Sequence, residues 1–138
     1  MKRIDPDQVE RQRARLDAFY QSGENPAVVK TRLQHAMWTG AGIFRNWTDL
    51  EATLSTVDQL SGIALHAKSS RNLIDSCTVQ NMCLLASLIC RSALIREESR
   101  GAHVRTDIRQ AWDATNSPFG HTFVSQSREG IERREAAR

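Results

Sequence analysis

The sequence predicts an all-α fold: an antiparallel helical bundle of three to four helices with a small C-terminal appendix, either irregular or a β-hairpin. Apolar residues recur at helical spacing through most of the first 100 positions. Most of the predicted helices begin at residues typical of helix N-termini, and strand-like composition occurs only beyond residue 120. The 138 residues fit a single helical domain. We expect an N-terminal helix (1–20), a bundle core (26–100) and a C-terminal part (101–138) with the end of a polar segment and the appendix.

The first two helices are each introduced by a capping residue followed by proline. Asp5-Pro6 predicts a helix that ends near Tyr20 and carries only a thin apolar stripe. Asn25-Pro26 repeats the signal for a second helix. Its inward positions are Val29, Leu33, Ala36 and Met37.

The third helix follows a short connector. The second helix should stop near Gly40 to Gly42, because two close glycines are costly in a helix, and Ile43 and Phe44 are expected to be buried. Thr48 and Glu51 have the spacing of a capping box. The inward stripe of this helix, which is expected to run to about His66, comprises Leu50, Leu54, Val57, Leu60 and Ala64.

The fourth helix is expected to be the central one. After a polar loop at 67–71, it should begin at about Asn72 or Thr78 and run to Arg100, where Gly101 suits a left-handed C-cap. Its apolar positions cover much of its circumference, which predicts burial on most sides. They include Met82, Leu85, Leu88, Ile89, Ala93 and Leu94.

The C-terminal appendix has the composition of a hairpin. Residues 120–125 are strand-like, 127–130 resemble a turn, and 131–135 could pair back despite their charges.

Composition excludes several classes of function. The net charge of +3 comes from 19 Lys+Arg against 16 Asp+Glu, and the arginines are interspersed with acids, which argues against a nucleic-acid partner. An odd number of cysteines without a secretory signal indicates a reducing compartment. No uncharged apolar run approaches the length of a membrane span. We therefore expect a cytoplasmic protein.

No motif for catalysis, cofactor or metal binding is apparent. The four histidines are scattered, and no Cys-x-x-Cys pair is present. Cys83 and Cys90 would lie about 10 Å apart along one helix, too far for a disulfide. No glycine-rich phosphate loop follows a strand. We therefore expect no catalytic, cofactor or metal site in this chain.

One segment, residues 96–107, is unusually rich in hydrogen-bonding side chains, and we call it the polar latch. It directly follows a strongly apolar helix. One interpretation is a solvated helix end with a glycine cap. The other is an interface in which arginines and carboxylates pair with a neighbouring polypeptide. The chemistry alone does not choose between them.

The same residues carry a family resemblance. The stretch from Ala93 to His103, ALIREESRGAH, closely resembles the A-L-x-R-x-E-S-R-G-A-H signature in the C-terminal domain of succinate dehydrogenase and fumarate reductase flavoproteins and of L-aspartate oxidases. Arg105 to Asp107 resembles the R-x-D that follows it. Four further stretches occur in the family's order: 23–26, 33–46, 80–86 and 121–122. After Asp107 the sequence departs from the family pattern, which leaves the path to His121 open.

The resemblance implies a helical domain that supports a FAD-dependent oxidoreductase acting on a C4 dicarboxylate. In the family, the substrate residues and the main flavin site belong to an FAD-binding domain and a capping domain, and nothing in this chain matches them. We therefore expect no cofactor bound by this chain alone and FAD in the parent flavoprotein. The expected partners are those two domains and, through a complex at the inner face of the membrane, an iron–sulfur subunit. Isolated, the domain is expected to self-associate through exposed apolar surface.

The residues expected to make interdomain hydrogen bonds all belong to the polar latch. They are Glu98, Ser99, Arg100, His103, Arg105 and Asp107. Three alternatives remain open: the C-terminal domain of an L-aspartate oxidase, a free-standing interaction module with the same fold, and, as the weakest, a basic helical nucleic-acid binder.

Overall fold

A computed structural model describes residues 5–109, 122–127 and 130–135 of the chain. Four helices account for most of it: α1 (Pro6–Ala18), α2 (Pro26–Gly40), α3 (Trp47–Ser61) and α4 (Ser70–Ile95). Two short strands, β1 (Phe44–Arg45) and β2 (Val104–Arg105), pair in parallel, and β3 (Thr122–Ser127) pairs antiparallel with β4 (Gly130–Glu135). The predicted helical bundle with a small appendix is confirmed.

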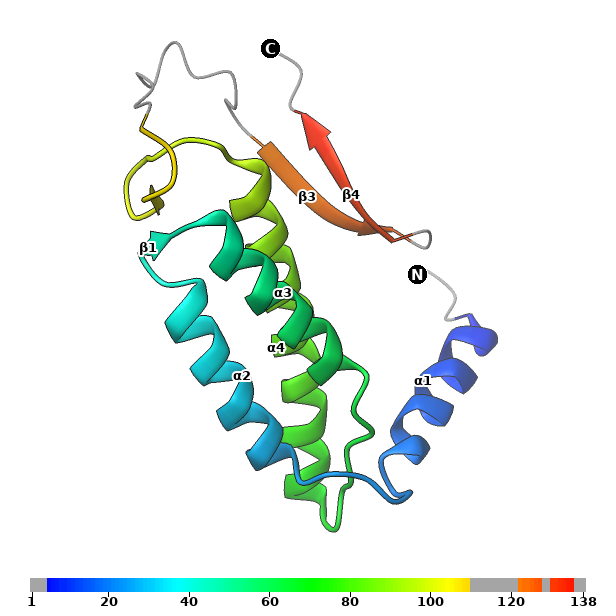
Figure 1. Cartoon of the computed structure of the whole chain (residues 1–138). Coiled ribbons are helices and arrows are strands. Elements are labelled where there is room, and N and C mark those ends of the chain that lie inside the picture. Colours follow the sequence, from blue (N-terminus) through cyan, green and yellow to red (C-terminus); the bar gives the residue numbers. More distant parts are fainter. Residues whose placement is uncertain (1–4, 110–121, 128–129, 136–138) are drawn as a thin grey trace.

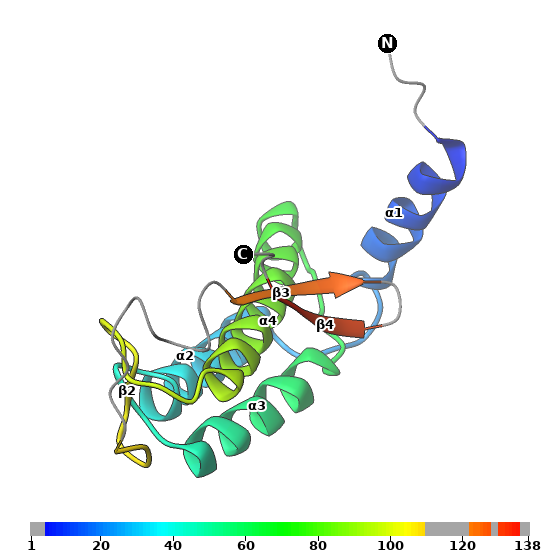
Figure 2. The ribbon, with the colours of Figure 1, turned by 90° about the horizontal axis from the view of Figure 1, so that it is seen from above.

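Helices α2, α3 and α4 form the bundle, running up, down and up in Figure 1. Each of the three helices packs against the other two. The predicted burial of α4 on most sides is wrong, because 7 of its 26 residues are buried and several of its large apolar side chains are exposed. Helix α1 stands apart from the bundle in both views (Figures 1 and 2) and buries none of its own residues. It is anchored by the adjacent Phe19, which is 3% exposed and whose carbonyl accepts a hydrogen bond from the Ala67 amide at 2.7 Å.

Local capping chemistry sets the helix starts, as expected for α1 and α2. The side chains of Asp5 and Asn25 accept hydrogen bonds from the amides two residues ahead, at 3.1 and 2.9 Å, and proline occupies the first turn of both helices. The predicted capping box at Thr48 is wrong. Asn46 caps α3 instead, accepting from the Asp49 amide at 2.8 Å, so the helix begins two residues earlier.

Several predicted boundaries and burials in the bundle core differ from the structure. Helix α3 ends at Ser61 rather than near His66, so Ala64 lies outside its stripe. Helix α4 begins at Ser70, inside the predicted loop, because Ser69 accepts from the Asn72 amide at 3.2 Å. It ends at Ile95, five residues before Arg100. The expected buried connector is wrong too, since Ile43 and Phe44 are 58% and 72% exposed.

The buried face of α4 is made of small residues rather than the predicted leucines. Besides Ser87, its buried residues recur at alternating steps of three and four, which keeps one seam against the neighbouring helices: Ser76, Val79, Cys83, Ala86, Cys90 and Ala93. Leu85 and Ile89, predicted to be buried, are 58% and 43% exposed. Small side chains let α2 and α3 approach closely, and those helices supply the bulk of the core: Val29, Leu33, Leu50, Val57 and Leu60.

The C-terminal hairpin is confirmed. Its register pairs Thr122 with Glu135 and Ser127 with Gly130, so the turn falls where the sequence predicts it. Strand β3 lies against α4. The segment between Arg109 and Thr122, where the sequence departs from the family pattern, is outside the described residues.

By length and composition, α4 is the one helix in the described part of the chain that could cross a membrane. Its most apolar window has a mean hydropathy of 1.5, and 33% of that window is buried in the structure. A single such helix is weak evidence for a span, because the central helix of a bundle passes the same test.

Candidate functional site

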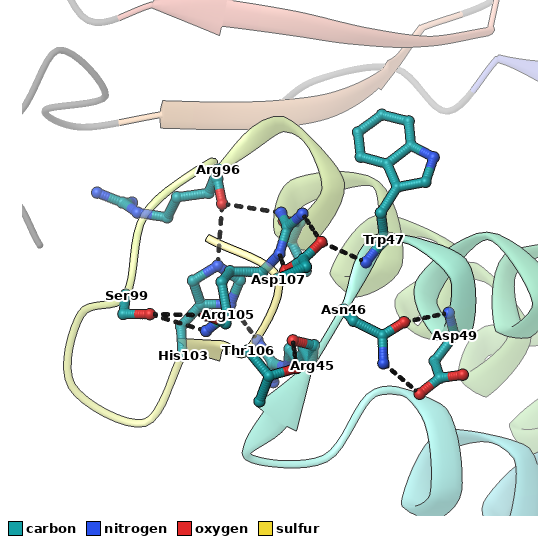
Figure 3. Close-up of polar contacts among 11 residues, drawn as sticks. Arg45, Asn46, Trp47, Asp49, Arg96, Ser99, His103, Arg105, Thr106 and Asp107 are labelled. Atoms are coloured by element: carbon teal, nitrogen blue, oxygen red, sulfur yellow. Dashed lines mark hydrogen bonds and ion pairs between the residues drawn. The ribbon is translucent and has the colours of Figure 1, made fainter. Parts of the chain in front are cut away.

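The polar latch folds back onto the C-terminal end of α4 and the N-terminal end of α3 (Figure 3). Arg105, only 3% exposed, is at its centre. Its Nη1 donates to the carbonyl oxygens of Ala93 and Arg96 at 3.2 and 3.3 Å. These carbonyls have no partner within the helix, and the guanidinium brings positive charge to the negative end of the helix dipole. Arg105 therefore caps α4 from a position nine residues beyond Arg96.

Asp107 connects that cap to α3. Its carboxylate accepts from Nε and Nη2 of Arg105 at 2.9 and 2.8 Å, a bidentate pair. The same carboxylate accepts from the Trp47 backbone amide, in the first turn of α3, at 2.7 Å. The hydrogen bonds from Arg105, together with the Trp47 amide, hold the pKa of Asp107 well below its usual range despite some desolvation. One carboxylate thus joins the end of one helix to the start of another.

The β1–β2 pair fixes the position of this carboxylate. The Val104 and Thr106 amides donate to the carbonyls of Ile43 and Arg45 at 3.0 and 2.8 Å. Ser99 Oγ accepts from the Arg105 amide at 2.8 Å, so the backbone on both sides of the arginine is held.

A turn presents Arg100 at the surface. Arg100 and His103 exchange two backbone hydrogen bonds, of 2.8 and 3.0 Å, across the intervening residues. Gly101 has φ of +57°, the left-handed conformation that favours glycine. The predicted left-handed glycine is confirmed in conformation, but it belongs to this turn and not to the end of α4, where Arg96 is the C-cap in an extended conformation.

His103 is held as one neutral tautomer. Its Nε2 lies 3.0 Å from the Arg96 carbonyl, which can only accept, and its Nδ1 lies 2.8 Å from Arg45 Nη1, which can only donate. Nε2 therefore carries the proton. Burial lowers the pKa of His103, and the charges of three nearby arginines lower it further, against a raising effect of the Arg96 carbonyl.

Glu98 is the most buried carboxylate of the polar latch. Its side chain is 1% exposed and pairs with Arg96, whose Nε and Nη2 both lie 2.7 Å from Oε1. Arg96 and Arg105 thus each have a carboxylate of the latch itself as partner.

The structure therefore gathers five of the six predicted site residues into one hydrogen-bonded cluster within the chain: Glu98, Ser99, His103, Arg105 and Asp107. Arg100 joins through its backbone, and its side chain is exposed. Their part in interdomain hydrogen bonds stays a prediction. The sequence reasoning missed Arg45 and Trp47, which the fold places beside the cluster. Arg45 lies within residues 33–46, which resemble the family pattern, and this was a signal for Arg45; Trp47 lies just beyond that stretch.

The described residues offer little for metal or nucleotide chemistry. Among them, no group of three or more His, Cys, Asp or Glu side chains could hold a metal ion. A hollow between α3 and α4 is lined by polar and apolar groups in similar measure, and its arginine, Arg91, lies 3.5 Å from Asp58. Cys83 and Cys90 are buried free thiols, and Cys77 is half-buried.

Comparison with known protein families gives a match over most of the chain. The sequence profile of a family described as fumarate reductase flavoprotein C-term matches residues 30–135. This range begins in α2 and ends with β4.

Among curated relatives, the chain is 35% identical over 106 residues to a polypeptide of the fumarate reductase (CoM/CoB) of Methanothermobacter marburgensis. It is 38% identical over 99 residues to L-aspartate oxidase of Rhodospirillum rubrum. These matches cover 72% and 68% of this chain but only 19% and 32% of the relatives. The chain is therefore similar to a minor part of each.

Solved structures give the same picture. FrdA of E. coli quinol fumarate reductase superposes with a TM-score of 0.71 at 26% identity, over 96% of this chain and 25% of that chain. Sdh1 of Mycobacterium smegmatis gives a TM-score of 0.78 over 95% of this chain at 21% identity, which supports the fold alone.

Proposed function

The chain belongs to the fumarate reductase flavoprotein C-terminal domain family, and from this premise we propose that it is the helical C-terminal part of a FAD-dependent flavoprotein of the succinate dehydrogenase/fumarate reductase type. In this role it packs on the flavin-binding part and supports oxidation or reduction of a dicarboxylate. The substrate and proton-transfer residues belong to the other part of the protein.

The proposal rests on how much of each chain the structural match to FrdA includes. The likeness to FrdA takes in 96% of this chain but only 25% of FrdA. A chain that corresponds throughout to a quarter of a flavoprotein is best explained as a supporting part of such a protein. Another relative is described as an FAD-dependent oxidoreductase, of Methanocaldococcus jannaschii, which supports FAD as the cofactor of the parent.

The described residues do not fit FAD itself. A dinucleotide pyrophosphate is bound by amides at a helix N-terminus that follows a glycine-rich turn. In this chain Gly40 and Gly42 lie at the C-terminal end of α2, where the free backbone groups are carbonyls, which repel phosphate. We therefore assign the flavin to the partner polypeptide.

The polar latch supplies a rigid surface for docking. Its inward side chains are satisfied within the chain, so the loop is held in place before any partner arrives, which reduces the entropy lost on binding. Arg100 projects from this rigid loop, and part of the Asp107 carboxylate is exposed. We propose that Arg100, as the most accessible donor, and the exposed part of Asp107 make interdomain hydrogen bonds directly, and that Glu98, Ser99, His103 and Arg105, the other residues predicted for this interface, support them by holding the loop in place.

A parent with L-aspartate oxidase activity is the second candidate. The 38% identity to the Rhodospirillum rubrum enzyme favours it, whereas the FrdA likeness and the Methanothermobacter relative favour succinate and fumarate. As part of a succinate dehydrogenase or fumarate reductase, the chain would act at the inner face of the membrane, together with an iron–sulfur subunit. As part of an L-aspartate oxidase, it would serve a cytoplasmic enzyme of NAD biosynthesis.

Complementation tests the proposal. The parent flavoprotein, truncated before this domain and loaded with FAD, is mixed with the 138-residue chain. We expect a stable complex and recovered dye reduction with either succinate or L-aspartate, and the active substrate identifies the parent. A chain that binds no flavoprotein fragment would contradict the docking role and favour a free-standing interaction module, and flavin bound at one per isolated chain would contradict the assignment of FAD to the partner.

A further inference from the structure

Arg45 differs from the other buried and half-buried arginines in lacking an acidic partner. Arg91, Arg96 and Arg105 pair with Asp58, Glu98 and Asp107 at 3.5, 2.7 and 2.8 Å. Among the described residues no carboxylate lies within ion-pair distance of the Arg45 guanidinium. Burial lowers the pKa of Arg45, because desolvation disfavours its charge and no carboxylate compensates for it. A half-buried, uncompensated charge is costly, which suggests that its partner lies outside this part of the chain.

The orientation of Arg45 is fixed by neutral groups. Nε donates to the carbonyls of Ala41, at 3.2 Å, and Gly42, and Nη1 donates to Nδ1 of His103 at 2.8 Å. Because these partners are uncharged, they position the guanidinium without neutralising it. No group in the described part of the chain accepts a hydrogen bond from Nη2, so one side of the planar fork remains available to an acceptor.

Arg45 lies at the edge of a shallow groove along the outer side of α4. The groove is lined by Leu88, Ile89, Ser92, Arg96, His103 and Arg45. Glu98 already neutralises Arg96, and His103 is held as the neutral tautomer, so among the described residues that line the groove Arg45 is the one unbalanced positive charge, above an apolar floor. Leu85, 58% exposed and one turn before Ile89, extends this apolar surface along the helix.

We propose that this groove, the Arg45 groove, is where the flavin-binding part of the parent flavoprotein inserts an aspartate or glutamate side chain flanked by apolar residues. The inference rests on the proposed docking function and specifies its site and chemistry. Two observations choose this occupant. The unbalanced guanidinium fits a carboxylate by charge, and the relatives carry a much longer polypeptide, of which this chain matches 19% and 32%.

Two kinds of polar residue therefore lie near the end of α4. Arg105 and Asp107 hold the domain together internally, whereas Arg45 is poised for a contact outside it. Sequence reasoning placed the interdomain contacts in the polar latch and did not single out Arg45, because only the fold reveals which arginines already have carboxylates.

Charge variants of Arg45 test this proposal. The measured quantity is the affinity of each variant for the FAD-loaded flavoprotein truncated before this domain. R45Q and R45E lose the same hydrogen bonds to Ala41, Gly42 and His103, so the difference between them reports the charge facing the partner. We expect R45Q to weaken binding about tenfold and R45E about a hundredfold, since a like-charge contact adds repulsion. R91Q, which removes a half-buried arginine that already has a carboxylate partner, is the control and should bind within about twofold of the unchanged chain.

Thermal unfolding of each variant verifies the fold, and salt dependence separates an ion pair from a structural effect. Binding by the unchanged chain should weaken as salt rises, and binding by R45Q should depend on salt less. Equal affinities of R45Q, R45E and the unchanged chain would contradict the proposal that a partner carboxylate binds in the Arg45 groove, but not the docking function itself. No binding by the unchanged chain would overturn both.

Discussion

The carboxylate of Asp107 accepts hydrogen bonds from Nε and Nη2 of Arg105, two residues away in sequence, at 2.9 and 2.8 Å. Arg105 also donates to a carbonyl at the negative C-terminal end of α4, and Asp107 also accepts from an amide at the positive N-terminal end of α3. The pair therefore links the end of one helix to the start of the other. The orientation of β2 and the loop before it depends on this link.

Replacing Asp107 with Asn should destabilise the chain by about 2 kcal/mol, because the buried Arg105 guanidinium loses its charged partner. Urea unfolding followed by circular dichroism measures the change. D75N, which removes one partner of an exposed ion pair with Arg71, should cost less than about 0.5 kcal/mol. Equal effects of the two substitutions would contradict the structural role of Asp107.

Replacing Arg105 with Lys should cost about 2–3 kcal/mol even though the charge remains. A lysine cannot reach both carbonyls and bind the carboxylate with two parallel hydrogen bonds. The matched control is R91K, at the half-buried Arg91. A double-mutant cycle with D107N should give a coupling free energy above about 1 kcal/mol, and additive effects would argue against a direct pair.

Stability should fall as pH decreases below the ordinary pKa of histidine. The pKa of folded His103 is lowered from 6.5, mainly by burial, so the unfolded chain binds more protons between the folded and unfolded values. The contribution of His103 to the free energy of unfolding is therefore complete above about pH 6.5, and it is lost as pH falls from there through the lower pKa of the folded state. Melting temperatures between pH 8 and pH 5 measure this, and H103N should reduce the slope; an unchanged slope would contradict the neutral tautomer.

Gly40 should tolerate no side chain. A Cβ there would clash with Thr53 Oγ1 and lie 3.0 Å from the Asp49 carbonyl oxygen. Either Thr53 must turn away and lose its hydrogen bond to that carbonyl, or α2 and α3 must separate. We expect G40A to destabilise by about 2 kcal/mol, despite the better helix propensity of alanine. In G62A the nearest atom would be 3.6 Å away, and stability should stay within about 0.5 kcal/mol.

The three thiols should react at very different rates. Burial raises the pKa of Cys83, and it raises the pKa of Cys90 to about 11, so neither forms the reactive thiolate readily at pH 8. Cys77 is half-buried and should react first with a thiol reagent under native conditions. The substitution C77S should remove the fast phase; a fast phase that persists would show that α4 opens locally.

The sequence predicted the features of the fold that are set locally. Asp5-Pro6 and Asn25-Pro26 start helices because capping depends on a few neighbouring residues. The capping box at Thr48 failed for the same local reason: Asn46, two residues earlier, provides a competing cap with Asp49 as its partner.

Features that depend on packing were not predictable in the same way. Helix α4 is apolar on nearly all sides, so its periodicity could not reveal that the small residues, such as Cys90 and Ala93, face inward while Leu85 faces out. The β1–β2 pair joins two-residue segments distant in sequence, which leave no period-2 pattern. The polar latch was recognised by its chemistry, but its inward direction is set by the end of α4 and the start of α3.

The contact between Trp47 and Asp107 spans 60 residues of chain, and this separation has a kinetic consequence. The loop it closes contains α3 and α4, whose docking brings the two ends together, so the entropy of closure is largely lost before the contact can form. Interactions absent from the folding transition state act mainly on the unfolding rate. We therefore expect the Trp47–Asp107 hydrogen bond to slow unfolding of the folded chain and to have little effect on the folding rate.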